Sequence, residues 1–156
     1  MPRTNQSQIE TWRLFLTAHA RVTDALESEL QDAGLIPLTW YDVLVQLTEA
    51  GGSLRMQDLA RSVLLSKSGL TRLVDRMERE GLVRREQCPS DRRGMLASAT
   101  PAGITALRKA APVHLEGVAL HFLDLLTSAE SAAIKSAFAK ITRALGAESA
   151  TAGRPT

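Results

Sequence analysis

The 156-residue chain has a single cysteine, Cys88, and few aromatic residues. One cysteine cannot form an intrachain disulfide, so the sequence predicts a reducing, cytoplasmic setting. Aromatic residues make up only 4% of the chain, so leucine, valine, isoleucine and alanine must build the core. No apolar run approaches the ~18–20 residues that a membrane-spanning helix needs. The first residues, MPRTNQSQIETW, have no apolar segment typical of a signal peptide.

The common motifs of catalysis and metal binding are also missing. There is no H-E-x-x-H, no G-x-x-x-x-G-K-[ST] and no G-x-S-x-G, and Cys88 has no evident histidine partner. His114 and His121 share a helix face but lie too far apart to chelate one ion, and no cysteine cluster accompanies them or His19. We therefore expect no enzyme activity, no cofactor and no metal site.

Positive charge is concentrated in one segment of the chain. The net charge is only +2, yet the segment from Arg55 to Gly94 holds ten Lys and Arg residues, nine of them Arg, against six Asp and Glu. The rest of the chain holds nine basic residues against eleven acidic ones. Such a distribution is typical of a face that binds a polyanion.

Long helices are predicted at both ends. Apolar residues at spacings of three and four predict a first helix over about 7–32. Thr100 and Pro101 are typical of an N-cap and first helical residue, so a long helix is predicted to begin there, with a kink at Pro112. The capping box T-S-A-E, starting at Thr127, predicts a last helix.

Shorter elements are predicted between these helices. Thr39 is a plausible N-cap for a second helix, with Asp42 in its first turn and an inward face formed by Val43, Leu44 and Leu47. The tripeptide S-L-R at 53–55 has the length of an edge strand.

The segment 55–81 is predicted to form helix, tight turn, helix. Ser66 is expected to cap the second of these helices, and Gly81 to end it. Within that helix Leu70, Leu73, Val74 and Met77 form an apolar stripe. The opposite stripe is polar and mostly basic.

Two predicted strands, L-V-R-R-E-Q and M-L-A-S-A-T, follow this pair of helices. They flank the stretch C-P-S-D-R-R-G, a hairpin tip of seven residues with two arginines. The element order is then α-α-β-α-α-β-β-α-α. This order is mainly helical with a small β-hairpin wing, a winged helix-turn-helix core flanked by long helices.

The polar stripe and the hairpin tip have the chemistry of DNA reading. A recognition helix carries small or polar side chains near its N-terminus, where it enters the major groove. Arginines on a hairpin tip suit a narrow minor groove. We expect Asp91 and Gly94 to shape the tip. The DNA contacts are expected from Ser66, Lys67, Ser68, Thr71, Arg72, Arg76, Arg92 and Arg93.

The whole segment from L-R-M-Q-D-L-A-R to A-T-P-A-G resembles the winged helix-turn-helix core of the MarR family of bacterial transcription regulators. Four motifs carry the resemblance: S-K-S-G-L-T-R at the start of the recognition helix, E-G-L-V-R after its end, D-R-R in the wing, and T-P-A-G at the start of the next helix. It implies a homodimer that binds a pseudo-palindromic operator in duplex DNA, usually as a repressor. Residues 7–36 and 101–146 would form the dimerisation lobe, residues 37–100 the DNA-binding domain and 147–156 a flexible tail.

The resemblance also implies that a small aromatic or anionic ligand triggers release from DNA. Trp12, Asp42 and Arg85 resemble residues of urate-responsive members, in which a link between Asp42 and Arg85 would tie a scaffold helix to the wing. An ordinary structural ion pair between Asp42 and Arg85, whatever the ligand, is the favoured interpretation. The residues expected at a ligand site are Trp12, Phe15, His19, Trp40, Asp42 and Arg85.

Two other functions are compatible with the sequence. Cys88 follows Arg84 and Arg85, so a redox-responsive regulator is one alternative, although an inert thiol is favoured. A winged-helix protein–protein adaptor is another. Salt-dependent binding to duplex DNA distinguishes a regulator from an adaptor, because phosphate neutralisation weakens as salt is added.

Overall fold

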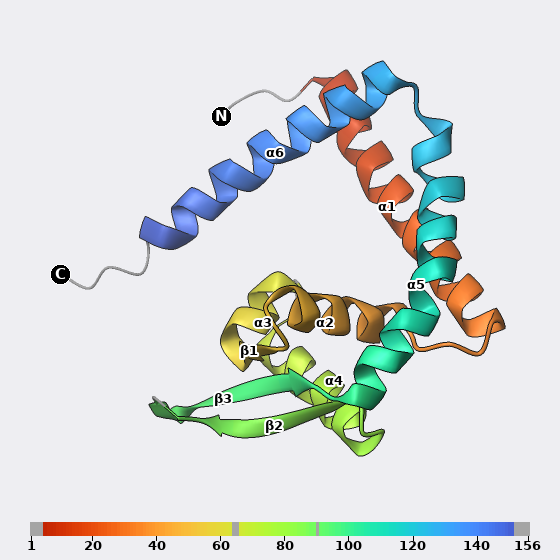
Figure 1. Ribbon diagram of the computed structural model, residues 1–156. Coiled ribbons are helices and arrows are strands. Elements are labelled where there is room, and N and C mark those ends of the chain that lie inside the picture. Colours follow the sequence, from red (N-terminus) through yellow and green to blue (C-terminus); the bar gives the residue numbers. More distant parts are fainter. Residues whose placement is uncertain (1–4, 64–65, 90, 152–156) are drawn as a thin grey trace. The chain divides into compact units, whose positions relative to one another are not determined.

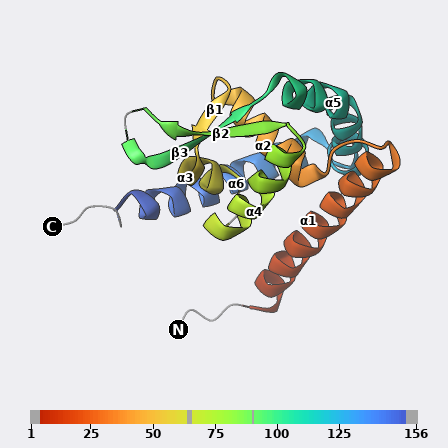
Figure 2. The same ribbon diagram turned by 90° about the horizontal axis from the view of Figure 1, so that it is seen from below.

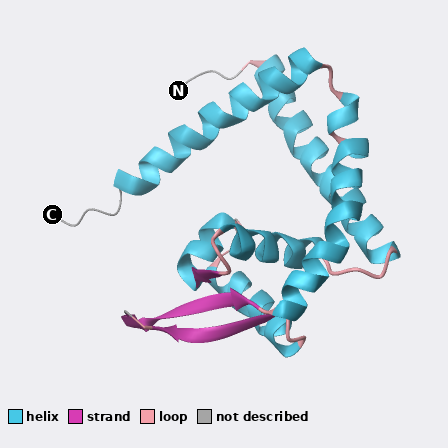
Figure 3. Ribbon diagram, viewed as in Figure 1, coloured by secondary structure: helices cyan, strands magenta, loops and turns pink. Residues whose placement is uncertain are grey.

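The computed structural model describes residues 5–63, 66–89 and 91–151, and for residues 92, 93 and 146–151 it describes the backbone alone. The protein is mainly helical with one small antiparallel sheet, as the sequence predicts (Figures 1 and 3). The elements are α1 (Gln6–Asp32), α2 (Leu38–Glu49), β1 (Ser53–Arg55), α3 (Met56–Ser62), α4 (Lys67–Arg79), β2 (Val83–Cys88), β3 (Asp91–Ala99), α5 (Pro101–His121), the 3-10 turn η1 (Leu123–Leu125) and α6 (Ser128–Thr151).

The first two helices are bounded by local signals, except at the start of α2. Asn5 and Gln8 form a capping box at the start of α1, and Gly34 follows its end with a φ of 66°. The predicted N-cap at Thr39 is wrong, because α2 already begins at Leu38. A tertiary contact takes the cap's place: Glu27 accepts a hydrogen bond from the backbone N–H of Leu38 at 2.8 Å.

The helix-turn-helix has the predicted boundaries. The hydroxyl of Ser66 accepts a hydrogen bond from the N–H of Gly69 at 3.1 Å and so caps α4. At the other end, Gly81 has a φ of 72°, and the N–H of Leu82 bonds back to the carbonyl of Met77 at 2.9 Å. This is the glycine-terminated helix end that the sequence predicts.

The sheet has the strand order β1-β3-β2, with every neighbouring pair antiparallel. β1 is therefore an edge strand, as predicted for the tripeptide S-L-R at 53–55. The predicted seven-residue tip is wrong, since Cys88 belongs to β2 and Asp91 begins β3. The two strands continue almost to the turn, where the register shifts between Gln87 and Cys88.

The core lies where α2, α3 and α4 meet one face of the sheet. The predicted stripe of α4 is buried, and so are the predicted inward residues of α2. The largest side chains with less than 2% exposure include Leu44, Leu47, Leu59, Leu70 and Met77. Aliphatic residues thus fill this core, as the scarcity of aromatic residues requires.

The start of α5 is tied to the end of α4. Thr100 donates a hydrogen bond from its hydroxyl to the carbonyl of Gly81 at 2.6 Å and accepts one from the N–H of Gly103 at 3.0 Å. The predicted N-cap at Thr100 is therefore confirmed. Gly103 packs so closely that a Cβ at this position would collide with the carbonyl oxygen of Leu82.

The chain forms two compact units, Met1–Gly117 and Val118–Thr156. The second unit holds the end of α5, η1 and α6, and its predicted capping box is confirmed by a 2.8 Å bond from the N–H of Thr127 to Glu130. α6 continues to Thr151, so the predicted tail at 147–156 begins inside a helix. Among the described residues, no helix is long and apolar enough to cross a membrane.

Gly103→Ala tests the close approach of α5 to the end of α4. The added methyl group meets backbone that cannot rotate away, so the free energy of unfolding should fall by about 1–3 kcal/mol. Urea denaturation monitored by circular dichroism measures this change. Arg108→Ala, on the exposed side of the same helix, is the matched control and should stay near the wild-type value. Equal stability of Gly103→Ala and the control would contradict the packing described here.

Candidate nucleic-acid interface

The polar face of α4 is exposed because the opposite face is buried in the core. Lys67, Ser68, Thr71, Arg72 and Arg76 are all exposed, whereas the apolar stripe is at most 4% exposed. The hydroxyl of Thr71 donates to the carbonyl of Lys67 at 2.8 Å. The capping Ser66 is exposed as well, so the N-terminal turn presents backbone N–H groups with polar side chains around them.

The hairpin of β2 and β3 projects past α3 in both ribbon views (Figures 1 and 2). Arg92 and Arg93 lie in β3, and their side chains are outside the described residues. Gly94 lies where the strands approach each other, since a Cβ there would be 3.2 Å from Oδ2 of Asp91 and 3.3 Å from Cβ of Cys88. Position 94 thus has little room for a side chain.

Arg85 connects β2 to the last turns of α4. Its Nη2 lies 2.7 Å from Oδ1 of Asp75 and 2.8 Å from Oε2 of Glu78, and its Nε donates to the same Oε2 at 3.0 Å. The backbone N–H of Arg85 donates to Oε1 of Glu78 at 2.8 Å. These bonds, the backbone one first, lower the pKa of the Glu78 carboxyl below its ordinary value.

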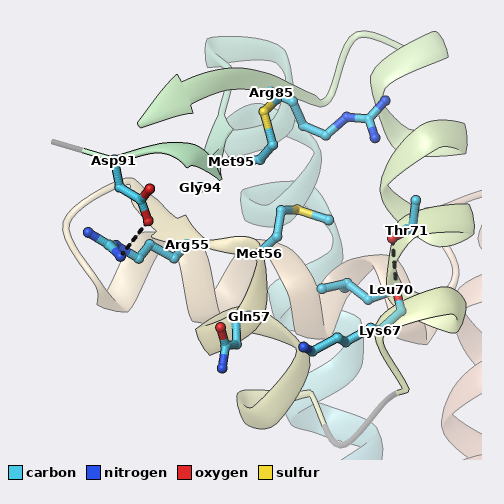
Figure 4. Close-up of a pocket in the computed structure, with 10 residues that line it drawn as sticks. All are labelled: Arg55, Met56, Gln57, Lys67, Leu70, Thr71, Arg85, Asp91, Gly94 and Met95. Carbon is cyan, nitrogen blue, oxygen red and sulfur yellow. Dashed lines mark hydrogen bonds and ion pairs between the residues drawn. The ribbon is translucent and has the colours of Figure 1, made fainter. Parts of the chain in front are cut away.

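A second ion pair lies further out on the hairpin. Nη1 of Arg55 is 3.7 Å from Oδ2 of Asp91, so the end of β1 contacts the start of β3 through this pair (Figure 4). Between the two ion pairs is a hollow of about 500 Å³ under the hairpin. Its lining combines apolar side chains with several cationic ones: Arg55, Met56, Gln57, Lys67, Leu70, Thr71, Arg85, Asp91, Gly94 and Met95.

The residues expected at a ligand site do not form one cluster. Arg85 lines the hollow under the hairpin, whereas Asp42 lines a different hollow. The expected link between Asp42 and Arg85 is not formed, because Arg85 is held by Asp75 and Glu78, which are closer along the chain and on the adjacent helix. Trp40 packs against the core.

The other three expected ligand residues form an aromatic row on α1. The rings of Trp12 and Phe15 are 5.7 Å apart and those of Phe15 and His19 are 6.4 Å apart. All three residues are exposed, Trp12 to 59%. Exposed apolar rings on a helix need a covering surface, so this row is better suited to an interface than to an enclosed pocket.

The hollow that Asp42 lines contains an unusual histidine. The ring centroids of His114 and Tyr41 are 4.2 Å apart with the planes tilted by 37°, and Nδ1 of His114 is buried without a hydrogen-bond partner among the described residues. Burial lowers the pKa of His114, and nearby Asp42 partly opposes this effect. Burial raises the pKa of the Asp42 carboxyl above its ordinary value, and the nearby charge of His114 partly lowers it again.

Cys88 does not present a reactive thiol at the surface. It is 6% exposed and lies at the irregular end of β2. A sensor thiol needs access to its oxidant, so this burial favours the inert thiol over the redox alternative. In the described part of the chain, no three His, Cys, Asp or Glu residues are placed to hold a metal ion.

Known proteins combine this helix-turn-helix with this hairpin. The family model of the MarR family matches residues 29–94, from the end of α1 to the hairpin. The regulator YkoM of Bacillus subtilis, an HTH-type transcriptional regulator, is 30% identical over 125 residues, which cover 78% of this chain and 80% of YkoM.

Solved structures extend the similarity over nearly the whole chain. AbsC from Streptomyces coelicolor, a MarR family transcriptional regulator, is 37% identical with a TM-score of 0.84, over 94% of this chain and 99% of AbsC. Sco3205 from the same organism, solved in complex with DNA, is 33% identical with a TM-score of 0.85, over 93% of this chain and 92% of Sco3205. The chain belongs to the MarR family of transcriptional regulators.

Membership of the MarR family confirms the predicted winged helix and the predicted class of DNA-binding regulator. It also agrees with the expectation that the protein is not an enzyme, since these relatives are regulators. Which residues contact DNA or a ligand remains a prediction.

Sequence reasoning missed the ion-pair partners of the hairpin residues Arg85 and Asp91. The sequence pattern places Asp75 only in the polar stripe of α4 and indicates no role for Glu78 or Arg55. One signal is nevertheless present: a strand that starts directly after the Gly81 turn must fold back along the last turns of α4. Arg85 therefore has to pass close to Glu78.

The His114 environment makes a testable prediction about stability and pH. Because the folded protein holds the pKa of His114 below 6.5, the unfolded chain binds a proton more readily, and stability should fall as pH drops below about 6.5. His114→Gln removes this contribution. The free energy of unfolding from urea titrations at pH 7.5 and 5.5 should therefore differ less in His114→Gln than in wild type.

Lys109→Gln is the control, because Lys109 is exposed on the same helix as His114 and lies outside the hollow that His114 lines. It should keep the wild-type dependence on pH. An unchanged loss of stability at pH 5.5 in His114→Gln would show that His114 is not the responsible group.

Proposed function

We propose that this protein is a homodimeric, sequence-specific repressor that reads duplex DNA with α4 in the major groove and the β2–β3 hairpin in the minor groove. One observation carries the proposal: the core buries one stripe of α4 and leaves its basic, polar face exposed beside a projecting hairpin. A regulator of transcription acts on the chromosome, so a cytoplasmic location is part of the proposal.

The N-terminal half of α4 has the side chains that direct readout needs. Ser68 and Thr71 are short enough to let the helix approach base edges. Arg72 is long enough to make a bidentate contact with guanine, which is worth about 1–3 kcal/mol of discrimination. Arg76 lies one turn further along, and phosphate is its more suitable target. The DNA complex of the relative Sco3205 supports this use of the fold.

The two halves of the proposed interface should respond differently to substitution. Arg72→Ala should weaken binding to a preferred duplex by about tenfold or more and reduce the preference over other sequences. Arg93→Ala should weaken binding to all duplexes by similar factors. Fluorescence anisotropy with preferred and scrambled duplexes measures both effects, repeated over a series of salt concentrations.

Lys135→Ala on α6 controls for a simple loss of positive charge. Wild-type binding should weaken steeply as salt is added. If affinity does not depend on salt, or if Arg72→Ala and Arg93→Ala have identical effects on sequence preference, this mode of reading is wrong.

Exposed apolar residues support the proposed homodimer. On α1 they are Trp12, Leu14, Phe15 and Leu16, each at least 41% exposed. The second unit has its own set in Leu120, Leu123, Leu125, Phe138, Ile141 and Leu145. An isologous contact between two copies would remove such surfaces from water and would also present two copies of α4 to a symmetric operator.

Ile141→Glu tests the dimer. Ile141 is 53% exposed on α6, and a buried carboxylate at a subunit contact would be strongly unfavourable. Sedimentation velocity should show a dimer for the wild type and a shift towards monomer for Ile141→Glu. Lys140→Glu changes the neighbouring exposed residue and should leave the dimer intact. A monomeric wild type at micromolar concentration would contradict the proposal.

The hollow under the hairpin is the best-suited place for the proposed anionic effector. Lys67 and Arg85 supply positive charge there, and Met56 and Met95 supply apolar contact for a flat ring. A carboxylate bound beside Arg85 would compete with Asp75 and Glu78 for its guanidinium. Such a ligand would therefore change the contact between α4 and the hairpin, which provides a physical route to release from DNA.

A further inference from the structure

The middle of the hairpin is not held in place by apolar packing. In β2 no side chain between Val83 and Cys88 is buried. On the opposite strand Met95 is 42% exposed, and it lines the hollow beneath the hairpin. The orientation of this part of the hairpin therefore depends on polar contacts rather than on close packing.

The Glu78 carboxylate accepts three of these contacts, all of them from Arg85 on β2. One of its carboxylate oxygens accepts from the backbone N–H of Arg85, and the other accepts from Nε and Nη2 of the same residue. It thereby fixes both the course of the strand and the direction of the guanidinium. Glu78 lies on the last turns of α4, on the helix that also carries Arg72 and Arg76.

We propose that Glu78 is a positioning residue for DNA reading, which sets the angle of the hairpin relative to α4 by holding both the backbone and the side chain of Arg85. This inference rests on the proposed placement of the hairpin in the minor groove. Glu78 itself would not touch DNA. Its contribution appears only through the arginines at the end of the hairpin.

The direction in which DNA affinity changes when Glu78 is replaced separates a positioning role from simple electrostatics. Removal of a carboxylate from a DNA-binding face adds one unit of net positive charge, and this alone should strengthen binding to phosphate. If Glu78 positions the hairpin, its removal should weaken binding in spite of the more favourable charge. Glu80→Ala makes the same charge change at the end of the same helix, where Glu80 is exposed, and serves as the matched control.

A double-mutant cycle between Glu78→Ala and Arg93→Ala provides the main test. The probe is a duplex selected from random DNA by the wild-type protein, and anisotropy gives the affinities. Arg93→Ala should weaken the affinity for this duplex about tenfold in the wild-type and Glu80→Ala backgrounds. In the Glu78→Ala background it should weaken the affinity by less than about twofold. If the Glu78 contact were merely structural, Arg93→Ala would weaken the affinity by the same factor in all three backgrounds.

Two further readouts keep the test decisive. Amide hydrogen exchange at Arg85 should become faster in Glu78→Ala, while exchange at the buried Val74 stays slow. If Glu78→Ala unfolds, the shape-preserving Glu78→Gln replaces it in the cycle and should show a reduced cost of Arg93→Ala.

Two different failures are distinguishable. If Arg93→Ala costs nothing even in the wild type, the hairpin does not contact DNA, and both the placement of the hairpin and the role of Glu78 are wrong. If Arg93→Ala costs the full tenfold in the Glu78→Ala background, the hairpin contact stands and Glu78 does not position it.

Discussion

The burial of Leu70, Leu73, Val74 and Met77 determines which face of α4 meets solvent. These four side chains occupy one stripe, and the core formed with α2 and the sheet covers all of them. A helix buried on one side has no freedom to rotate, because any turn about its axis would expose apolar surface at a cost of about 25 cal/mol per Å². The exposed basic stripe is therefore held in one direction by the core behind it.

The hairpin depends on weaker forces than α4. Its base is part of the sheet and the core, but its middle crosses a hollow, and ion pairs connect it to Arg55 at the end of β1 and to α4. Exposed ion pairs typically contribute about 0–1 kcal/mol each, much less than a buried leucine. The same structure thus combines a fixed α4 with a hairpin whose angle small energies can change. That combination suits the proposed function, in which the protein both holds and releases DNA.

Local signals in the sequence predicted most of the fold, whereas contacts between distant residues were not predictable from such signals. The caps at Ser66, Thr100 and Thr127 depend on residues within one turn, and all three are confirmed. Thr39 failed as a cap because Glu27, far away in the sequence, satisfies the N–H of Leu38 instead. The partners of Arg85 were missed for the same reason, since they depend on how the hairpin folds back over α4.

Selection of bound duplexes from random DNA tests the central claim most directly, because it assumes nothing about the operator. The expected result is an inverted repeat whose half-site centres lie about 10–10.5 base pairs, or one helical turn, apart, as two copies of α4 related by a two-fold axis require. Arg72→Ala should also alter the enriched bases within each half-site. A single unrepeated site, or no enrichment above random sequence, would contradict the proposed mode of reading.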